Sequence, residues 1–227
     1  MTLRAEGAAK RYFRKTGQAN YFYAVQPLNL TLEPGALTVL MGRSGSGKTT
    51  LLHMLGGLLT PTEGKVWLGD TDLYSLKDAA LSRLRNGQIS VVPQGRSAVD
   101  TLTVMENILL PAALYGDGSR DDLAKHWMEA LGIAHLAQAR PAELSGGELR
   151  RMAIARALTV DPQVILADEP TGDLDDENTA LVLHAFRAAA DLGKTLLLVT
   201  HEADALPYAD RAYKMDAGAV TEWKTQG

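Results

Sequence analysis

The sequence of 227 residues contains no cysteine. The chain therefore has no disulfide, no thiolate metal site and no cysteine nucleophile, which suits a reducing compartment. It also has no excess of positive charge, because its formal net charge is −4. General nucleic-acid binding depends on lysine and arginine side chains that neutralise phosphates. We therefore expect no nucleic-acid partner.

Long apolar runs are absent too. The longer ones, such as residues 50–60 and 195–200, are well short of the roughly 20 residues that a membrane-spanning helix needs. The first residues, MTLRAEGAAKRYFRK, contain no apolar core of signal-peptide length. We expect the chain to remain inside the cell and any membrane attachment to come from another subunit.

Short apolar segments are present at 37–42, 163–169 and 194–201. They are β-branched or leucine-rich and end in polar residues, a pattern typical of strands buried on both faces of a parallel sheet. Helical patterns alternate with them, which predicts an α/β fold. These helical patterns cover residues 47–59, 145–160 and 177–193.

Other segments predict antiparallel strands. Residues 11–35 alternate apolar and polar side chains and end in a Pro34-Gly35 turn, and residues 63–73 look similar. Residues 211–223 predict a hairpin that turns near Asp216-Ala217-Gly218. Residues 95–143 carry helical patterns and no convincing strand, so we expect a helical insertion there.

The length and the hydrophobic content of 46% suit one domain over residues 1–227. We expect a core with an antiparallel β region at about 1–94 and 158–227. The helical subdomain is expected at about 95–157.

Residues 42–49, GRSGSGKT, fit the pattern G-x-x-x-x-G-K-[ST] between a strand and a helix. Glycines let backbone N–H groups turn onto phosphate oxygens, and the helix N-terminus adds the positive end of its dipole. Lys48 supplies a charge for the β and γ phosphates, and Thr49 offers a hydroxyl to Mg²⁺. The alternative is a glycine-rich turn with a surface lysine. The pattern predicts ATP or GTP binding by Gly42, Arg43, Ser44, Gly45, Ser46, Gly47, Lys48, Thr49 and Thr50.

Asp168 and Glu169 end the apolar segment VILADE. In this position Asp168 can hold Mg²⁺ through its waters, and Glu169 can polarise the attacking water. Taken alone, the two acids could equally be solvated or cap the next helix. The preceding P-loop favours the catalytic interpretation.

Ser145 and Glu148 in LSGGELRR fit the S-x-x-E capping box, which predicts a helix start. Gly146 and Gly147 allow a ligand to approach the backbone, and a helix N-terminus can bind an anion. An ordinary helix cap is the alternative, and these residues alone favour it.

Taken in order, GRSGSGKT, Gln94, LSGGE, VILADE, TGDLD and His201 resemble the nucleotide-binding subunit of ATP-binding cassette (ABC) transporters over nearly the whole chain. The resemblance implies a P-loop NTPase core with a mixed parallel sheet, an antiparallel β subdomain and an inserted helical subdomain. It also implies an ATP-dependent homodimer in which each ATP lies between the P-loop of one chain and the LSGGE segment of the other. Ser145, Gly146 and Gly147 then lie at the γ-phosphate of the ATP bound by the other chain.

The resemblance assigns further roles. Gln94 matches the glutamine that contacts Mg²⁺ and the water and links to the transmembrane partner. His201 matches the histidine that contacts the γ-phosphate and orients the catalytic residues. Asp175 matches the aspartate that crosses the dimer interface. The metal site so implied consists of Thr49, Gln94 and Asp168.

An aromatic side chain is expected to stack on adenine. Our choice is Tyr12 in AAKRY, with Tyr21 and Tyr23 as alternatives. The alternative for Tyr12 is a core or surface tyrosine that has no role in nucleotide binding.

One residue and one segment depart from the family pattern. The lipoprotein-release, macrolide-export and cell-division group of the family more often has asparagine at the position of Asp173, and we expect Asp173 to tune dimer closure. The segment GRSAVDTLTV replaces an aromatic and leucine-rich stretch that usually receives the coupling helix of the permease. We therefore expect an integral membrane permease to contact residues 94–104 through an unusual surface.

Within the family, LLHMLGGLLTPTEG, ELSGGELRRMAIARAL and LADEPTGDLD most resemble the lipoprotein-release, macrolide-export and cell-division group. The resemblance implies a peripheral ATPase at the cytoplasmic face of the inner membrane that drives an export-type permease. In the expected reaction Glu169 is the general base, while Lys48, Mg²⁺, His201 and the opposing Ser145 act on the γ-phosphate.

Other functions remain open at this point. They are a cell-division-type ATPase that regulates cell-wall remodelling, a soluble ATPase of iron–sulfur assembly or of chromosomes, and a nucleotide sensor without hydrolysis. The cargo and the direction of transport are not encoded in these motifs.

Overall fold

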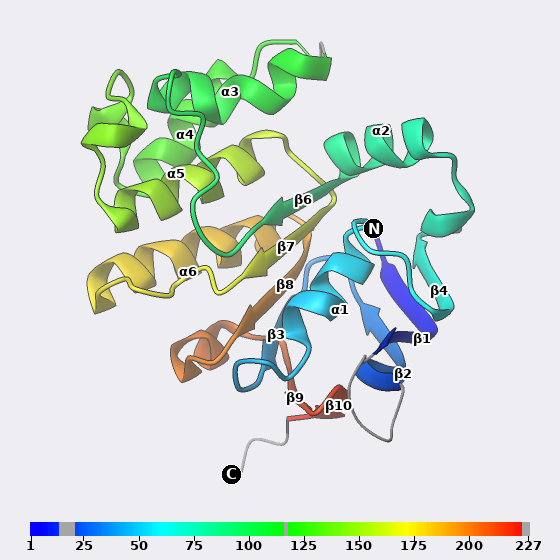
Figure 1. Ribbon diagram of the computed structural model, residues 1–227. Coiled ribbons are helices and arrows are strands. Elements are labelled where there is room, and N and C mark those ends of the chain that lie inside the picture. Colours follow the sequence, from blue (N-terminus) through cyan, green and yellow to red (C-terminus); the bar gives the residue numbers. More distant parts are fainter. Residues whose placement is uncertain (14–20, 116–117, 224–227) are drawn as a thin grey trace.

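A parallel sheet forms the centre of the computed structural model, which describes residues 1–13, 21–115 and 118–223. Within those residues its strand order is β10-β9-β3-β8-β7-β6 (Figure 1). Strands β9, β3, β8, β7 and β6 pair in parallel, and β10 pairs antiparallel with β9. The strands are β3 (Leu37–Met41), β6 (Ile89–Val92), β7 (Val164–Asp168), β8 (Thr195–Thr200), β9 (Arg211–Asp216) and β10 (Ala219–Glu222).

Helices cover this sheet and extend the molecule on one side. The helices α3, α4 and α5 pack against one another on the side of the core sheet that lies away from the antiparallel strands (Figure 1). The helices are α1 (Lys48–Leu55), α2 (Asp78–Gln88), α3 (Val104–Tyr115), α4 (Asp121–Ala130), α5 (Gly146–Thr159) and α6 (Asp176–Asp191). Short 3-10 turns span Leu73–Ser75, Ala134–Leu136, Pro141–Glu143 and Ala203–Tyr208.

Alternating side chains of the core strands enter two separate apolar cores. In β3, Val39 and Met41 join the core that contains residues of α5 and α6, whereas Leu40 joins the core that contains residues of α1. Strands β7 and β8 alternate in the same way. A strand with a side-chain period of two and full burial must be covered on both faces. This arrangement leaves the strand ends as the accessible part of the sheet.

The second sheet is antiparallel and has the order β2-β1-β4-β5 within the described residues. Gly7 and Gly64 bring β1 and β4 close together. A Cβ atom on Gly64 would lie 2.3 Å from the backbone of Gly7, so a larger residue does not fit there. The strands are β1 (Leu3–Phe13), β2 (Tyr21–Leu32), β4 (Glu63–Leu68) and β5 (Thr71–Asp72).

The expected α/β organisation is confirmed. The three buried segments form β3, β7 and β8, and the helical patterns form α1, α5 and α6. Residues 95–143 contain α3 and α4 and, among their described residues, no strand. The hairpin at 211–223 is also confirmed, and it extends the core sheet next to β3. Two features differ from expectation: β1 begins at Leu3, upstream of residue 11, and α2 was not predicted.

Candidate nucleotide-binding site

A cavity of about 520 Å³ lies where β3 and β7 end, between the P-loop and the aromatic ends of β1 and β2. Most of the predicted phosphate-binding residues and both predicted acids line it. The lining residues are Tyr12, Phe22, Tyr23, Ala24, Ser44, Gly45, Ser46, Gly47, Lys48, Thr49, Thr50, Gln94, Asp168, Glu169, Ala217 and Gly218.

The backbone of the P-loop depends on its glycines. Gly47 has a φ of 109°, and a Cβ atom there would lie 2.0 Å from the Ala24 carbonyl oxygen. A Cβ on Gly42 would lie 2.5 Å from the Met215 oxygen. The helix α1 then begins at Lys48, and no side chain of the described residues caps it. Its first N–H groups therefore remain available for an anion.

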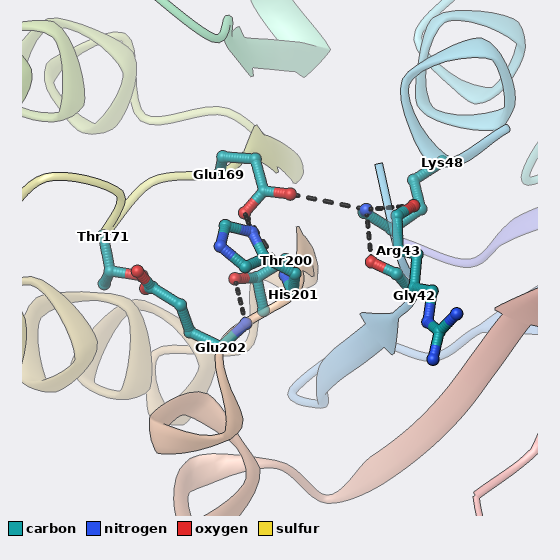
Figure 2. Close-up of polar contacts among 8 residues, drawn as sticks. All are labelled: Gly42, Arg43, Lys48, Glu169, Thr171, Thr200, His201 and Glu202. Atoms are coloured by element: carbon teal, nitrogen blue, oxygen red, sulfur yellow. Dashed lines mark hydrogen bonds and ion pairs between the residues drawn. The ribbon is translucent and has the colours of Figure 1, made fainter. Parts of the chain in front are cut away.

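Lys48 is directed back across the P-loop towards β7. Its Nζ donates to the carbonyl oxygens of Gly42 at 2.7 Å and Arg43 at 3.3 Å, and lies 3.4 Å from Glu169 Oε1 (Figure 2). The side chain is only 5% exposed. Burying an ammonium group is costly unless it is paired and hydrogen-bonded, and these contacts meet both conditions.

Glu169 also contacts His201, which follows β8. His201 Nδ1 lies 2.9 Å from Glu169 Oε2, and the His201 backbone N–H donates to the same oxygen at 3.3 Å. Glu169 itself has a φ of 47°, in the left-handed region that non-glycine residues rarely occupy. Such backbone strain is often found at functional sites, where the surrounding structure holds it.

A second pair of contacts holds the turn that carries His201. The Glu202 backbone N–H donates to Thr200 Oγ1 at 3.0 Å, and the Thr171 hydroxyl donates to the Glu202 carboxylate. These bonds connect the end of β8 to the segment after β7, as Figure 2 shows. The imidazole remains largely exposed at 63%, and it lines a smaller cavity next to the P-loop, not the main one.

Asp168 is almost fully buried, with 1% exposure. Burial raises the pKa of its carboxyl, and the negative charge of Glu169 adds to the increase, whereas a hydrogen bond with Thr49 opposes it. Asp168 Oδ1 and the Ser46 hydroxyl find no hydrogen-bond partner among the described residues. Buried polar atoms of this kind normally bind a ligand, an ion or water.

Comparison with known proteins identifies the family. Residues 25–172 match the family described as ABC transporter. The chain belongs to this family. The lipoprotein-releasing system ATP-binding protein LolD of Koribacter versatilis is 38% identical to it over 202 residues, covering 88% of this chain and 91% of that protein. An uncharacterized ABC transporter ATP-binding protein of Mycobacterium bovis is 38% identical over 204 residues.

The relatives differ from this chain in length, and solved structures of similar cassettes are known. The match to the M. bovis protein covers 88% of this chain but 62% of that protein, so this chain spans less than two thirds of it. The dimeric structure of MJ0796, a bacterial ABC transporter cassette, has a TM-score of 0.88 and 31% identity and covers 98% of this chain and 99% of that one. MJ0796 is also known as a dimer in a post-hydrolysis state bound to ADP and Pi, with the same TM-score and 30% identity.

In this ABC cassette the LSGGE segment lies outside the P-loop cavity. The predicted capping box is confirmed: Ser145 Oγ accepts from the Glu148 N–H at 3.3 Å, and Glu148 Oε2 accepts from the Ser145 N–H at 2.7 Å. Ser145 and Gly146 are exposed. One chain therefore does not bring Ser145, Gly146 and Gly147 together with Lys48.

Gly42 and Arg43 also lie outside the lining of the main cavity, in a smaller adjoining cavity with His201. Asp175 caps α6 by accepting from the Asn178 N–H at 2.8 Å. Among the tyrosines, Tyr12 and Tyr23 line the main cavity, whereas Tyr21 does not and its ring contacts Phe13.

The sequence-based candidates omit two arginines of α5 and four residues that line the cavity, namely Phe22, Ala24, Ala217 and Gly218. Phe22 lines the cavity because the β1–β2 register places it opposite Tyr12, with ring centroids 5.9 Å apart. Arg150 donates to the Pro93 oxygen at 2.9 Å. Arg156 donates to the Ser97 oxygen and hydroxyl at 2.8 and 2.6 Å. These arginines of α5 therefore hold the loop that carries Gln94 on both sides of that residue. The spacing of the residues in the sequence does not indicate this connection between α5 and the loop.

Proposed function

We propose that this chain is the ATP-hydrolysing subunit of a membrane ABC transporter and that two copies bind two ATP molecules between them. The carrying observation is the position of Glu169, whose carboxylate lies between Lys48 and His201 beside the P-loop cavity. A carboxylate held in this way can accept a proton from a water that attacks the γ-phosphate. The dimeric MJ0796 cassettes support the pairing.

In this proposal each residue has a separate task. Lys48 neutralises charge on the β and γ phosphates, Glu169 accepts the proton of the attacking water, and His201 positions Glu169 and the γ-phosphate. Ser145, Gly146 and Gly147 of the opposite chain bind the same γ-phosphate at the start of α5. Because this group bridges both chains, its loss on hydrolysis removes the interaction that favours the closed dimer.

Mg²⁺ is the metal that fits the oxygen donors of the site. The unpartnered Asp168 Oδ1, the Thr49 hydroxyl and the Gln94 amide are hard donors, and Mg²⁺ usually keeps several waters in such sites. No group of three or more His, Cys, Asp or Glu side chains in the described residues could hold a metal, so phosphate and water must supply other ligands. When bound, Mg²⁺ offsets phosphate charge.

The adenine base stacks on the aromatic wall of the cavity in this proposal. Tyr12 is 37% exposed and lines the cavity beside Phe22, with Tyr23 as the remaining alternative. Stacking on such a wall favours any planar base, so it adds affinity without selecting adenine over other bases.

The permease is proposed to contact residues 94–104. Arg150 and Arg156 connect this loop to α5, so a displacement of the loop can reach the LSGGE segment. No helix of the described residues is long and apolar enough to cross a bilayer. We place the subunit peripherally at the cytoplasmic face of the inner membrane, with no nucleic-acid partner. We treat residues 1–227 as one ABC ATPase domain, with its helical subdomain at about 95–157 and the remainder at about 1–94 and 158–227.

The cargo class is inferred from relatives. Several relatives are named as ATP-binding proteins of the lipoprotein-releasing system LolD, which favours export or extraction of a lipoprotein-like cargo. A cell-division-type role and a soluble role in iron–sulfur assembly are the alternatives. Copurification with an integral membrane protein would exclude the soluble role, and the identity of that protein would separate the other two.

The proposal is tested by the ATPase activity of the purified chain at increasing protein concentration. If the dimer is the active form, turnover per chain rises with concentration and levels off when all chains are paired. Phosphate release is the readout. Turnover per chain that is independent of concentration, in a preparation shown by sedimentation to be monomeric, would overturn the dimeric mechanism.

A further inference from the structure

A small basic cavity of about 180 Å³ adjoins the P-loop. Arg43 and Lys214 supply its positive charge, His201 also lines it, and no acidic side chain does. Its other lining residues are Met41, Gly42 and Trp223. The chain as a whole has a net charge of −4. The positive charge of this cavity is therefore opposite in sign to the net charge of the chain.

Arg43 and Lys214 are the cations of this cavity whose charged groups remain unpaired among the described residues. Lys48 is buried against Glu169, and His201 also contacts Glu169. The Arg43 guanidinium is exposed and forms no ion pair or hydrogen bond with any described residue. In Figure 2 it extends away from both Glu169 and the Lys48 amino group. A planar group with five donors is thus presented at the open edge of the site.

Asp173 is the corresponding unpaired acid. In the segment between β7 and α6, Asp168 is buried, Glu169 is paired, and Asp175 caps α6. The Asp173 side chain is exposed and, among the described residues, forms no ion pair or hydrogen bond. Its φ of 65° lies in the left-handed region, and the Leu174 N–H donates to the Thr171 oxygen at 3.0 Å beside it. This turn holds Asp173 on the outside of the site.

We propose that a second copy of this chain supplies the missing partner of the Arg43 guanidinium and of the Asp173 carboxylate. In the ATP-bound homodimer, Arg43 of each protomer pairs with Asp173 of the other. In a dimer with a two-fold axis this ion pair forms twice: Arg43 of the first protomer contacts Asp173 of the second, and Arg43 of the second contacts Asp173 of the first. The inference rests on the proposed ATP-dependent dimer and names the ion pair that aligns it.

Electrostatics favours such a local pair. Two chains with a charge of −4 each repel one another, and the bound triphosphates increase the repulsion. A complementary pair at the interface offsets this repulsion and selects the correct register. The guanidinium can bind a carboxylate through two parallel hydrogen bonds, which the Lys214 ammonium in the same cavity cannot do.

The test is a double-mutant cycle on dimerisation. Arg43→Gln, Asp173→Asn and the double variant are made in a Glu169→Gln background that slows hydrolysis, and the dimer Kd with ATP is measured by sedimentation equilibrium. Asparagine tolerates the left-handed backbone of residue 173. The matched controls are Lys214→Gln in the same cavity, alone and combined with Asp173→Asn, and Arg83→Gln on the exposed surface of α2. Binding of ATP to each monomer is measured separately.

If the pair forms, each single substitution weakens the dimer about tenfold, and the double variant is no weaker than either single variant. The ratio of the dimer Kd values of the double variant and the parent also becomes smaller when NaCl is raised from about 0.05 to about 0.5 M, because salt screens the pair. Single effects that multiply to about a hundredfold in the double variant overturn the ion pair. Coupling of Asp173 to Lys214 instead of Arg43 overturns the assignment of Arg43. A parent that stays monomeric with bound ATP overturns the dimeric function itself, together with this inference.

Discussion

His201 Nδ1 lies 2.9 Å from Glu169 Oε2, although 32 positions separate the two residues in the sequence. Lys48 Nζ lies 3.4 Å from the other carboxylate oxygen. The His201 backbone N–H donates to the same Oε2 at 3.3 Å. These contacts on both carboxylate oxygens fix the orientation of the Glu169 side chain, as the position of a general base requires. The carboxylate also lies in reach of the P-loop cavity, where a nucleotide would present its terminal phosphate.

Replacing Glu169 by glutamine tests its role as the base. The amide keeps the size of the side chain but cannot accept the proton, so Glu169→Gln should lower turnover by about 10²- to 10⁴-fold. ATP should still bind. Phosphate release and equilibrium ATP binding are measured on the same preparation. Glu177→Gln, an exposed change in the first turn of α6, is the matched control. Turnover near that of the parent would remove Glu169 from the reaction.

Lys48→Ala should act on binding. The substitution removes a buried cation whose charge-assisted contacts are directed into the P-loop, and we expect nucleotide affinity to fall about 10- to 100-fold. Isothermal titration with ATP measures this loss. Lys77→Ala, an exposed change before α2, should leave affinity unchanged. Unchanged affinity in Lys48→Ala would show that the phosphates bind elsewhere.

Ser145→Arg should separate monomer binding from dimerisation. The new side chain blocks the anion site at the start of α5, so ATP should still bind one chain but should no longer induce dimers. Ser145→Ala controls for the lost helix cap, which costs about 1 kcal/mol. Size-exclusion chromatography with and without ATP gives the readout. ATP-induced dimers of Ser145→Arg would contradict the assigned position of this segment.

Asp168→Asn should increase the stability of the chain without nucleotide. Burial raises the pKa of Asp168, so the folded state disfavours its charge, and an uncharged amide relieves this cost. We expect a Tm about 2–4 °C higher at pH 7, the shift that 1 kcal/mol produces in a chain of this size. The added stabilisation by Mg²⁺ over ATP alone should disappear in the variant.

The pH dependence of this effect has a defined sign. A carboxyl whose pKa is raised on folding binds its proton more tightly in the folded state, so stability falls as pH rises from its ordinary pKa towards the raised value. The Tm difference between Asp168→Asn and the parent should therefore be small below about pH 4 and grow as pH increases. A difference that is largest at low pH would contradict the assigned direction.

The sequence by itself determined the core strands, their helices and the P-loop. Buried parallel strands have a continuous apolar composition, and the P-loop pattern depends on glycines whose backbone the structure confirms at Gly47. Both signals are local, so they can be read without knowing the fold. The start of β1 was missed because its buried residues include Ala5, Ala8 and Ala9, which have weak strand propensity. Helix α2 was missed because it buries only Leu81 and so lacks an apolar stripe.

Tertiary structure alone decided which distant groups meet. Strand register places Phe22 beside Tyr12, and the parallel order of β3, β8 and β7 brings Lys48, His201 and Glu169 to one edge of the sheet. The packing of α5 connects Arg150 and Arg156 to the loop after β6. These contacts join residues far apart in the chain, and local propensity carries no information about such distances. The chemistry of the motifs was therefore legible in the sequence, whereas the pairing of their charges required the fold.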